Sequence, residues 1–269
     1  MKRIHFLEIH DQKWCPASLR DALTRFLAFF IFWGRPYVSV ASLLSQTLNR
    51  NGTRKVLDLC SGGGGPWPQL LTRVRDRLDD RADEFAVSLT DKFPPRLIGE
   101  LPDGLSFETD SVDAMSIEPA RTGFRTLFTS FHHFRPNEAR AVLEDAVRND
   151  SGIAIFEFTR RHPRTMLPYL VTPFIVWVAV PFMRPFRLRD WLWTYPIPIL
   201  PAVVTFDGIV SCLRTYSPDQ CLQLASESDP EGRFKWRSGV RPSLAGGMTY
   251  LIGVPKKKQK ATVSDHASA

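Results

Sequence analysis

Cysteine is scarce in this chain of 269 residues. No two of its four cysteines form a CxxC pair; they are Cys15, Cys60, Cys212 and Cys221. We therefore expect neither a disulfide framework nor a cysteine-based zinc cluster, and we expect a reducing compartment. Extreme charge is also missing, because the net charge is +7 with 43% apolar and 23% charged residues. These fractions exclude a disordered chain, and the length suits one large α/β domain or two small ones.

Signals for export and for nucleic-acid binding are weak. Met1-Lys2-Arg3 is basic, but Glu8, His10 and Asp11 interrupt any apolar core that would follow in a signal peptide. The lysines from Lys256 onward have no aromatic residues among them. We expect a basic disordered tail at 256–269, no nucleic-acid partner and a cytoplasmic protein.

Strand and helix patterns alternate between residues 55 and 158. Two helical pieces are predicted within 18–50, separated by Gly34-Arg35-Pro36. Short apolar runs then predict five strands, at 55–59, 85–89, 105–107, 125–129 and 152–158. Two more strands are predicted at 234–237 and 248–254, after a helix that begins at the capping box Ser217-Pro218-Asp219-Gln220. This order is typical of a doubly wound, mostly parallel seven-stranded sheet.

The strongest motif is a glycine run that follows the first strand. Val56-Leu57-Asp58-Leu59-Cys60-Ser61 leads into Gly62-Gly63-Gly64-Gly65. Glycine allows a sharp turn and a close approach of a ligand to the backbone. No Lys-Ser/Thr pair follows, which excludes a P-loop, and the spacing differs from the dinucleotide fingerprint, which disfavours an NAD-dependent oxidoreductase.

The segment Asp58–Gly64 resembles the first motif of class I S-adenosylmethionine-dependent methyltransferases, acid-x-Gly-x-Gly-x-Gly. Gly62 and Gly64 match its second and third glycines, and Cys60 stands in place of the first. The likeness covers roughly residues 50–160. The blocks around Asp113, His132-His133 and 139–147 are similar to the ubiquinone/menaquinone-biosynthesis type, within an uncharacterised bacterial branch. The resemblance implies a Rossmann-like methyltransferase fold.

That resemblance also implies where S-adenosyl-L-methionine would bind. The loop of Asp58, Cys60, Ser61, Gly62 and Gly64 would hold the methionine end of the cofactor. Asp91 ends the second strand, at the sheet edge where ligands bind in α/β folds, and its carboxylate suits two ribose hydroxyls. Asp113 is the preferred residue for the adenine, with Asp110 as its competitor.

The fourth and fifth strands bring candidate catalytic residues to the same edge. His132 and His133 follow the fourth strand, and Glu157 ends the fifth. A histidine there would deprotonate an acceptor hydroxyl or polarise an acceptor carbonyl, with His132 preferred. The alternative is a structural histidine that caps the following helix or packs beneath the cofactor. No metal-ligand spacing links these residues, so we expect no metal.

An apolar, proline-rich segment at 163–213 separates the sheet strands. Tyr169–Met183 carries no charge and lies between arginines at 160, 161, 164, 184, 187 and 189. A membrane span needs about 20 apolar residues, and Pro173 and Pro181 interrupt the run. Three interpretations remain: a lid over a lipophilic acceptor, a peripheral contact with a membrane surface, and a transmembrane hairpin.

The sequence therefore predicts three parts: an N-terminal helical segment at 1–50, a cofactor-binding domain at 51–255 with an apolar insertion at 163–213, and the basic tail. The predicted activity is S-adenosylmethionine-dependent methyl transfer to a small lipophilic acceptor. The alternative is a non-catalytic membrane-surface module that retains the cofactor fold.

Overall fold

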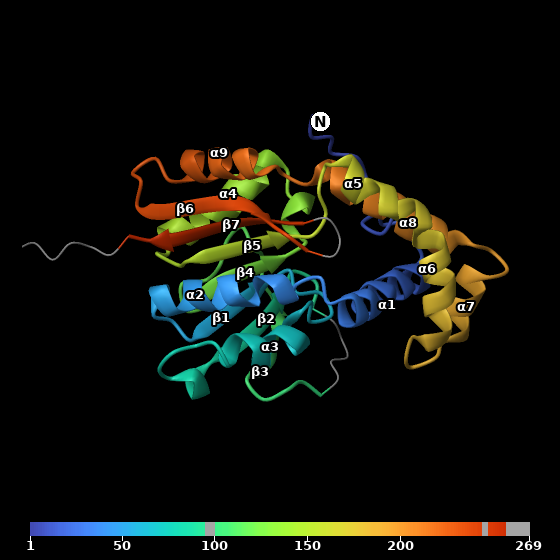
Figure 1. Ribbon diagram of the computed structural model, residues 1–269, viewed down its shortest axis with the longest axis horizontal. Helices are drawn as coiled ribbons and strands as arrows, with labels where there is room; N and C mark the ends of the chain where they lie inside the picture. The colour runs from blue at the N-terminus through green and yellow to red at the C-terminus, as the bar shows by residue number, and fades with distance from the viewer. Residues whose placement is uncertain (95–99, 244–246, 257–269) are drawn as a thin grey trace, which may run out of the picture.

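A seven-stranded sheet forms the body of the protein, in a computed structural model that describes residues 1–94, 100–243 and 247–256. The strand order is β3-β2-β1-β4-β5-β7-β6 (Figure 1). The strands are β1 (Lys55–Leu59), β2 (Ala86–Asp91), β3 (Leu105–Ser111), β4 (Phe124–Phe128), β5 (Ile153–Glu157), β6 (Phe234–Arg241) and β7 (Met248–Pro255). The first five are parallel, and β7 is antiparallel to both β5 and β6. This arrangement confirms the predicted mostly parallel sheet of seven strands. Most of the predicted tail, 257–269, lies outside the described residues.

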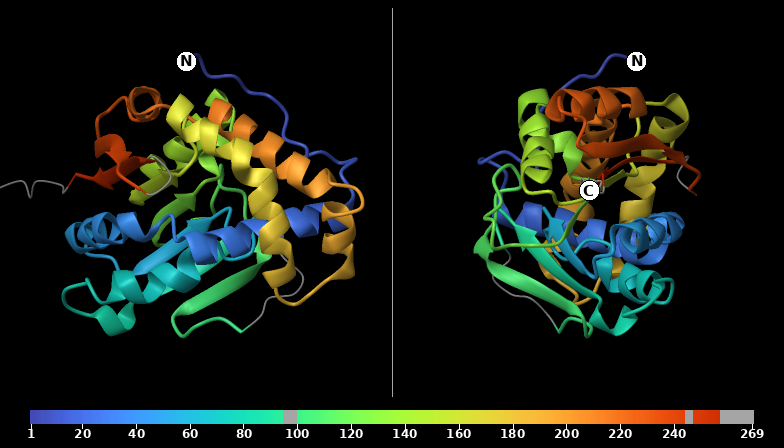
Figure 2. Two further views of the ribbon diagram at one scale, coloured as in Figure 1. Left: turned by 45° about the vertical axis from the view of Figure 1, so that its right-hand side comes forward. Right: turned by 90° about the vertical axis from the view of Figure 1, so that its left-hand side faces the viewer.

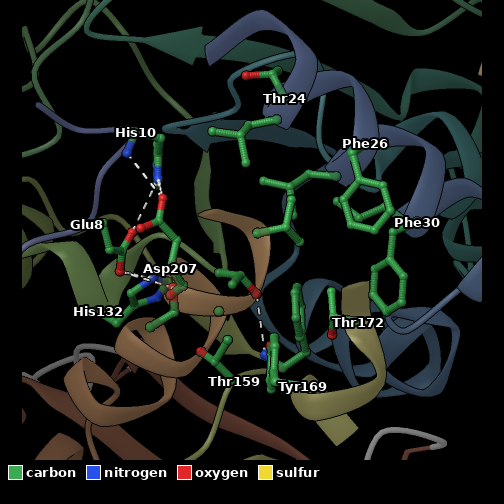
Figure 3. A pocket seen from close by; sticks show the side chains of 18 of the residues that line it. Glu8, His10, Thr24, Phe26, Phe30, His132, Thr159, Tyr169, Thr172 and Asp207 are labelled. Carbon is green, nitrogen blue, oxygen red and sulfur yellow. Dashed lines mark hydrogen bonds and ion pairs between the residues drawn. The ribbon is translucent and has the colours of Figure 1, made fainter. Parts of the chain in front are cut away.

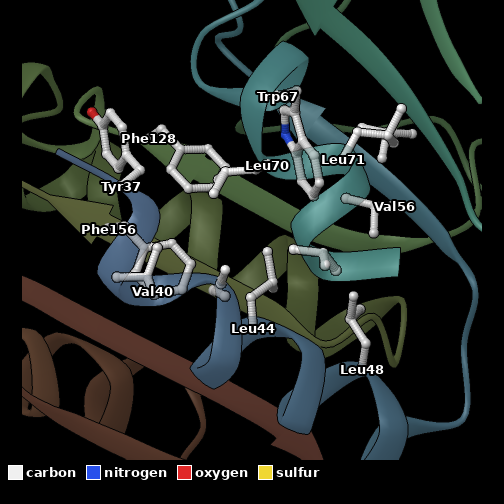
Figure 4. Close-up of a cluster of buried hydrophobic side chains, with 14 of the residues drawn as sticks. Tyr37, Val40, Leu44, Leu48, Val56, Trp67, Leu70, Leu71, Phe128 and Phe156 are labelled. Atoms are coloured by element: carbon white, nitrogen blue, oxygen red, sulfur yellow. The ribbon is translucent and has the colours of Figure 1, made fainter. Parts of the chain in front are cut away.

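Helices cover both faces of the sheet, as a doubly wound fold requires. On one face, α2 (Ala41–Asn51) and α3 (Trp67–Arg75) pack on β1, β2 and β4. Figure 4 shows the large side chains of this core, including Leu44, Trp67 and Phe128. On the other face, α4 (Pro136–Arg148) and α9 (Pro218–Ser228) pack on the sheet and on each other. The central strands β4 and β5 are buried along their whole length, and the buried Arg125 of β4 forms an ion pair with Asp145 of α4 at 2.7 Å.

The capping box predicted at Ser217 is confirmed. The Gln220 backbone N–H donates to Ser217 Oγ, and the Ser217 N–H donates to Gln220 Oε1 at 3.1 Å. Pro218 occupies the first turn of α9, where its missing N–H leaves no helical hydrogen bond unmade. The helix therefore starts at the predicted residue.

A helical lobe lies to one side of the sheet (Figures 1 and 2). We use this name for α1 (Ala17–Gly34) together with α5 (Pro163–Met166), α6 (Thr172–Ala179), α7 (Leu188–Thr194) and α8 (Ile199–Arg214). Its own core contains Phe26 of α1, Val176 of α6 and Leu200 of α8. Short 3-10 turns complete the chain: η1 (Val38–Val40), η2 (Ala82–Glu84), η3 (Phe131–His133), η4 (Leu167–Val171) and η5 (Val180–Phe182). The two predicted N-terminal helices therefore separate, because α1 joins the lobe and α2 joins the sheet.

The prolines of the lobe do not interrupt its first helical run. Pro163–Phe182 is a continuous run of 20 residues through α5, η4, α6 and η5. A proline stands in the first turn of each of these four short elements, where the missing N–H is tolerated. By length and composition this run is able to cross a membrane, and two bent helix pairs pass the same test if each counts as one span. The expectation that Pro173 and Pro181 break this run is therefore wrong, whereas Pro196 and Pro198 do lie at the break between α7 and α8, which are bent by 75°.

Candidate functional site

The carboxyl ends of β1, β2 and β4 meet where the strand order reverses. From β1 the chain continues to β2 on one side, while β4 pairs with β1 on the other side. In open α/β sheets, ligands bind at this point, because the loops from adjacent strands diverge there. The glycine loop follows β1, Asp91 ends β2, and the histidine pair follows β4.

The glycine loop needs a left-handed backbone at several positions. Gly62 and Gly64 have φ of 54° and 103°, which glycine adopts without strain. Among the described residues, no atom lies within 4 Å of a Cβ built on Gly62 or on Gly63. Cys60 also has a positive φ, 56°, at the position where the resembled motif has glycine. Cys60 thus adopts the left-handed backbone conformation that favours glycine.

Asp58 points into the protein beneath the loop. Its side chain is buried and accepts hydrogen bonds from Ser61 Oγ and from Thr126 Oγ1, each at 2.6 Å. Burial raises the pKa of Asp58 to about 6, although both hydroxyls favour the charged form. Asp58 therefore fixes the start of the loop through Ser61, and any influence on a ligand would pass through that contact.

Substitution of Asp58 by Asn is expected to change how stability depends on pH. The folded-state pKa lies near 6, above the ordinary value of 3.8. Protonated Asp58 therefore contributes its full stabilisation of the folded state below pH 3.8, and this contribution is lost as pH rises through 6. Between about pH 4 and pH 7, wild-type protein should lose about 2–3 kcal/mol relative to Asp58→Asn. Urea unfolding of both proteins across this range measures the difference. If the difference in unfolding free energy between the two proteins did not change with pH, the raised pKa of Asp58 would be contradicted.

Asp91 contacts the glycine loop directly. The Gly62 N–H donates to Asp91 Oδ2 at 2.8 Å, and the Phe93 N–H donates to Oδ1 at 2.8 Å. Each carboxylate oxygen keeps a further lone pair for a ligand. The structure therefore brings together Asp91 and the loop, two elements that the sequence places at one edge.

The two candidates for the adenine lie in different surroundings. Asp113 forms an ion pair with Lys92 at 2.7 Å and accepts from the Met115 N–H. Asp110 is 81% exposed at its side chain, 3.7 Å from Arg121. Asp113 is thus held in place beside the residues that follow β2, whereas Asp110 points into solvent.

A cavity of about 300 Å³ lies between the sheet edge and the helical lobe. Figure 3 shows its two ends. The apolar end is lined by Phe26, Phe30 and Tyr169, and the polar end by His10, His132 and Asp207, among other residues. The ring of Tyr169 lies against Gly208 of α8, where a Cβ would come within 2.1 Å of it. The lobe therefore supplies one wall of this cavity, and residues that follow β4 and β5 supply another.

His132 and Glu157 form a buried pair at the polar end. His132 Nδ1 lies 2.7 Å from Glu157 Oε2, and the His132 backbone N–H donates to Oε1 at 3.2 Å. Burial disfavours the charged imidazole, but Glu157 outweighs it and the pKa of His132 is raised. For His133, burial and the neighbouring His132 lower the pKa. The two histidines are thus not equivalent, and the one paired with Glu157 is better oriented.

Three residues at this end were not predicted from the sequence as site residues. The segment before α1 brings Glu8 and His10 against the histidines, and α8 brings Asp207. Glu8 is fully buried and forms an ion pair with Arg214 of α8 at 2.9 Å. These residues are far from β4 in the sequence, so local patterns do not predict the contact. The available signal was that Glu8 and His10 are titratable residues in an N-terminal segment without an assigned role.

Comparisons with known proteins give a fold likeness only. No family model matches the sequence, and no curated protein matches it. Among solved structures, human N-acetylserotonin methyltransferase in complex with SAM is similar to this chain. The likeness covers 88% of this chain and 55% of the other chain, at 13% identity and a TM-score of 0.48. The plantazolicin methyltransferase BpumL in complex with SAH is also similar. That likeness covers 89% of this chain and 98% of the other chain, at 9% identity and a TM-score of 0.47.

A third similar structure is described as a putative zinc-dependent alcohol dehydrogenase from Rhodobacter sphaeroides. It covers 89% of this chain and 98% of its own, at 12% identity and a TM-score of 0.49. At these values the likenesses do not assign an activity to this chain. They do not test the ubiquinone/menaquinone-biosynthesis type either, which stays a prediction.

Proposed function

We propose that this protein binds S-adenosylmethionine and transfers its methyl group to a small lipophilic acceptor. The observation that carries this proposal is the contact between Asp91 and the Gly62 N–H at the carboxyl edge of the sheet. A largely apolar cavity is lined by the residues that follow the neighbouring strand β4. The loop would receive the methionine end over Gly62 and Gly63, where the space above the backbone is open. Asp91 would accept the ribose hydroxyls, and Asp113 would lie toward the adenine.

The residues of the cavity suit an acceptor that has an apolar body and one polar end. The bound cofactor supplies a methyl group whose bond to sulfur breaks as the bond to the acceptor forms. The aromatic walls would align the acceptor, and alignment alone contributes several kcal/mol to such a displacement. His132 would hold the acceptor's proton at Nε2, since Glu157 engages Nδ1 and stabilises the resulting charge.

Substitution of Asp91 by Ala is expected to weaken S-adenosylmethionine binding by about 1.5–3 kcal/mol, the range for hydrogen bonds to a charged group. Calorimetry with S-adenosylmethionine, its demethylated product and NAD measures this loss and the cofactor preference. Asp103→Ala is the matched control, because that side chain is exposed and precedes β3 at the end of the strand away from the site. Unchanged affinity in Asp91→Ala would remove the assignment, and preference for NAD would remove the proposed function.

We also propose that the helical lobe contacts a membrane surface. Several large apolar side chains of the lobe are more than half exposed, namely Leu167, Leu170, Val171, Phe174, Val178, Phe182, Phe186, Leu188 and Ile197. Exposed apolar patches of this kind mark interaction sites. Arg184 and Arg187 are exposed beside them and suit anionic headgroups. Such a contact would let a lipophilic acceptor enter the cavity from the membrane.

A further inference from the structure

We propose that Glu8, His132 and His133 bind a divalent transition-metal ion of the zinc class at the polar end of the cavity. Ligand atoms of these three residues lie within 4.8 Å of one another. A carboxylate with two imidazoles is a set that binds zinc and leaves a fourth position open. Metal binding itself does not depend on the proposed methyl transfer.

Two buried atoms in this cluster have no hydrogen-bond partner. They are Glu8 Oε2 and His132 Nε2, on residues that are 0% and 1% exposed. Buried polar atoms are nearly always partnered, because leaving one unpaired costs its full desolvation. Both residues line the cavity, at the point where ligand atoms of Glu8, His132 and His133 come together. An ion at that point would satisfy both of them.

The spacing between the side chains suits an ion better than hydrogen bonds. His132 Nε2 lies 3.7 Å from Glu8 Oε1, and His133 Nδ1 lies 3.7 Å from Glu8 Oε2. These distances exceed a hydrogen bond. Two ligands of a tetrahedral zinc ion, each about 2.0–2.1 Å from the metal, stand about 3.3 Å apart. A small inward movement therefore completes the site.

Glu157 supplies the outer support that metal-binding histidines usually have. It engages His132 Nδ1 at 2.7 Å and is itself held by Thr159 Oγ1 at 3.3 Å. A carboxylate on one ring nitrogen fixes the tautomer that presents the other nitrogen to a metal. The orientation of His132 is therefore already that of a ligand.

The surrounding charges also favour a cation. Three carboxylates lie against His132 or His133, those of Glu8, Asp11 and Glu157, and a fourth, Asp207, lies against His10. Arg214 is the cation that contacts two of them, at Glu8 Oε1 and at Asp11 Oδ2. His133 Nδ1 lies 3.2 Å from Asp11 Oδ2, and an ion would replace that contact. With neutral histidines, the negative charge exceeds the positive charge among these groups.

The use of this ion rests on the proposed function. The open fourth position would face the cavity that His10 and Asp207 also line. An acceptor oxygen bound there would have its pKa lowered by the ion, as zinc does for water. The ion would thus act where the cavity is polar, while the cofactor loop lies at the neighbouring strand end.

The test uses the untagged full chain, stripped with a chelator and titrated with ZnCl₂ or CoCl₂ alone. We expect one equivalent per chain, and a cobalt absorption spectrum of a four-coordinate site. Glu8→Gln and His132→Gln should lower zinc affinity more than 100-fold, and Glu157→Gln about 10–100-fold, the range for outer-shell partners. His162→Asn is the matched control, since His162 only caps α5, and it should bind as wild type.

Failure to bind either ion, or wild-type affinity in both Glu8→Gln and His132→Gln, would overturn the proposal. If these variants do not fold, X-ray absorption of the zinc-loaded wild type decides instead, because it must show two imidazole ligands. Calorimetry with S-adenosylmethionine on the zinc-free protein is run in parallel. Cofactor binding without zinc binding would refute the metal site alone, and zinc binding without cofactor binding would refute the proposed function alone.

Discussion

Substitution of His132 by Ala is expected to lower methyl-transfer turnover by about 10²–10⁴-fold, the usual contribution of a positioned general base. Affinity for S-adenosylmethionine should stay near wild type, because the glycine loop and Asp91 lie at other strand ends. Single-turnover rates with labelled cofactor and extracted lipids or quinones measure the loss. His133→Ala should have a smaller effect, since His133 is 30% exposed and has no contact with Glu157 equivalent to that of His132.

The dependence of turnover on pH provides a second test of His132 as the base. Burial works against the charged imidazole, yet Glu157 raises the pKa of His132 above its ordinary value of 6.5. A base must be unprotonated, so turnover should fall as pH drops through a pKa above 6.5 in metal-free protein. If His132→Ala and His133→Ala both keep near-normal turnover, no histidine base operates and alignment alone drives the transfer.

A metal ion bound to His132 would change the pH profile of turnover but not the loss of turnover expected in His132→Ala. His132 would then be a ligand, and its removal would still abolish the polar end of the site. The two roles are separable, because a chelator should inactivate a metal-dependent enzyme and leave a histidine base active. Metal-free activity and its pH profile therefore decide which role His132 has.

Local sequence patterns predicted the sheet and one side of the site. The run from Val56 to Gly65 contains both a buried strand and the glycines that the turn requires, so its structure is encoded locally. Asp91 follows from the same logic, since it ends the adjacent parallel strand. Such features depend on periodicity and turn chemistry within a few residues.

The polar end of the cavity depends instead on contacts between distant parts of the chain. Glu8 meets His132 and Arg214 only because the N-terminal segment lies against α8 and η3. Nothing within a short window of sequence marks Glu8 as a partner of a histidine more than a hundred positions away. The effect of Pro173 and Pro181 was misjudged for a related reason, since both fall in first turns whose boundaries tertiary packing sets.

Replacement of Phe174 and Val178 together by Glu is expected to weaken membrane binding by about 10²–10⁴-fold. The two side chains are 62% and 68% exposed on α6, and each loses about 1.5–3 kcal/mol of apolar burial in a membrane. Co-sedimentation with phosphatidylglycerol vesicles, compared with phosphatidylcholine vesicles, measures the partition and the share due to arginines. Leu222→Glu on α9 is the matched control, because Leu222 is 38% exposed outside the lobe.

The extraction behaviour of the bound protein distinguishes surface contact from insertion. Val176 and Ala179 of α6 pack against α1 and α8 in the core of the lobe, and a spanning helix would have to give up this packing or carry its neighbours into the bilayer. The run Pro163–Phe182 nevertheless has the length and composition of a span. High salt or alkaline carbonate should release a peripheral protein. Retention after carbonate, together with loss of binding in the Glu variant, would show that this run inserts and that the acceptor cavity opens within the bilayer.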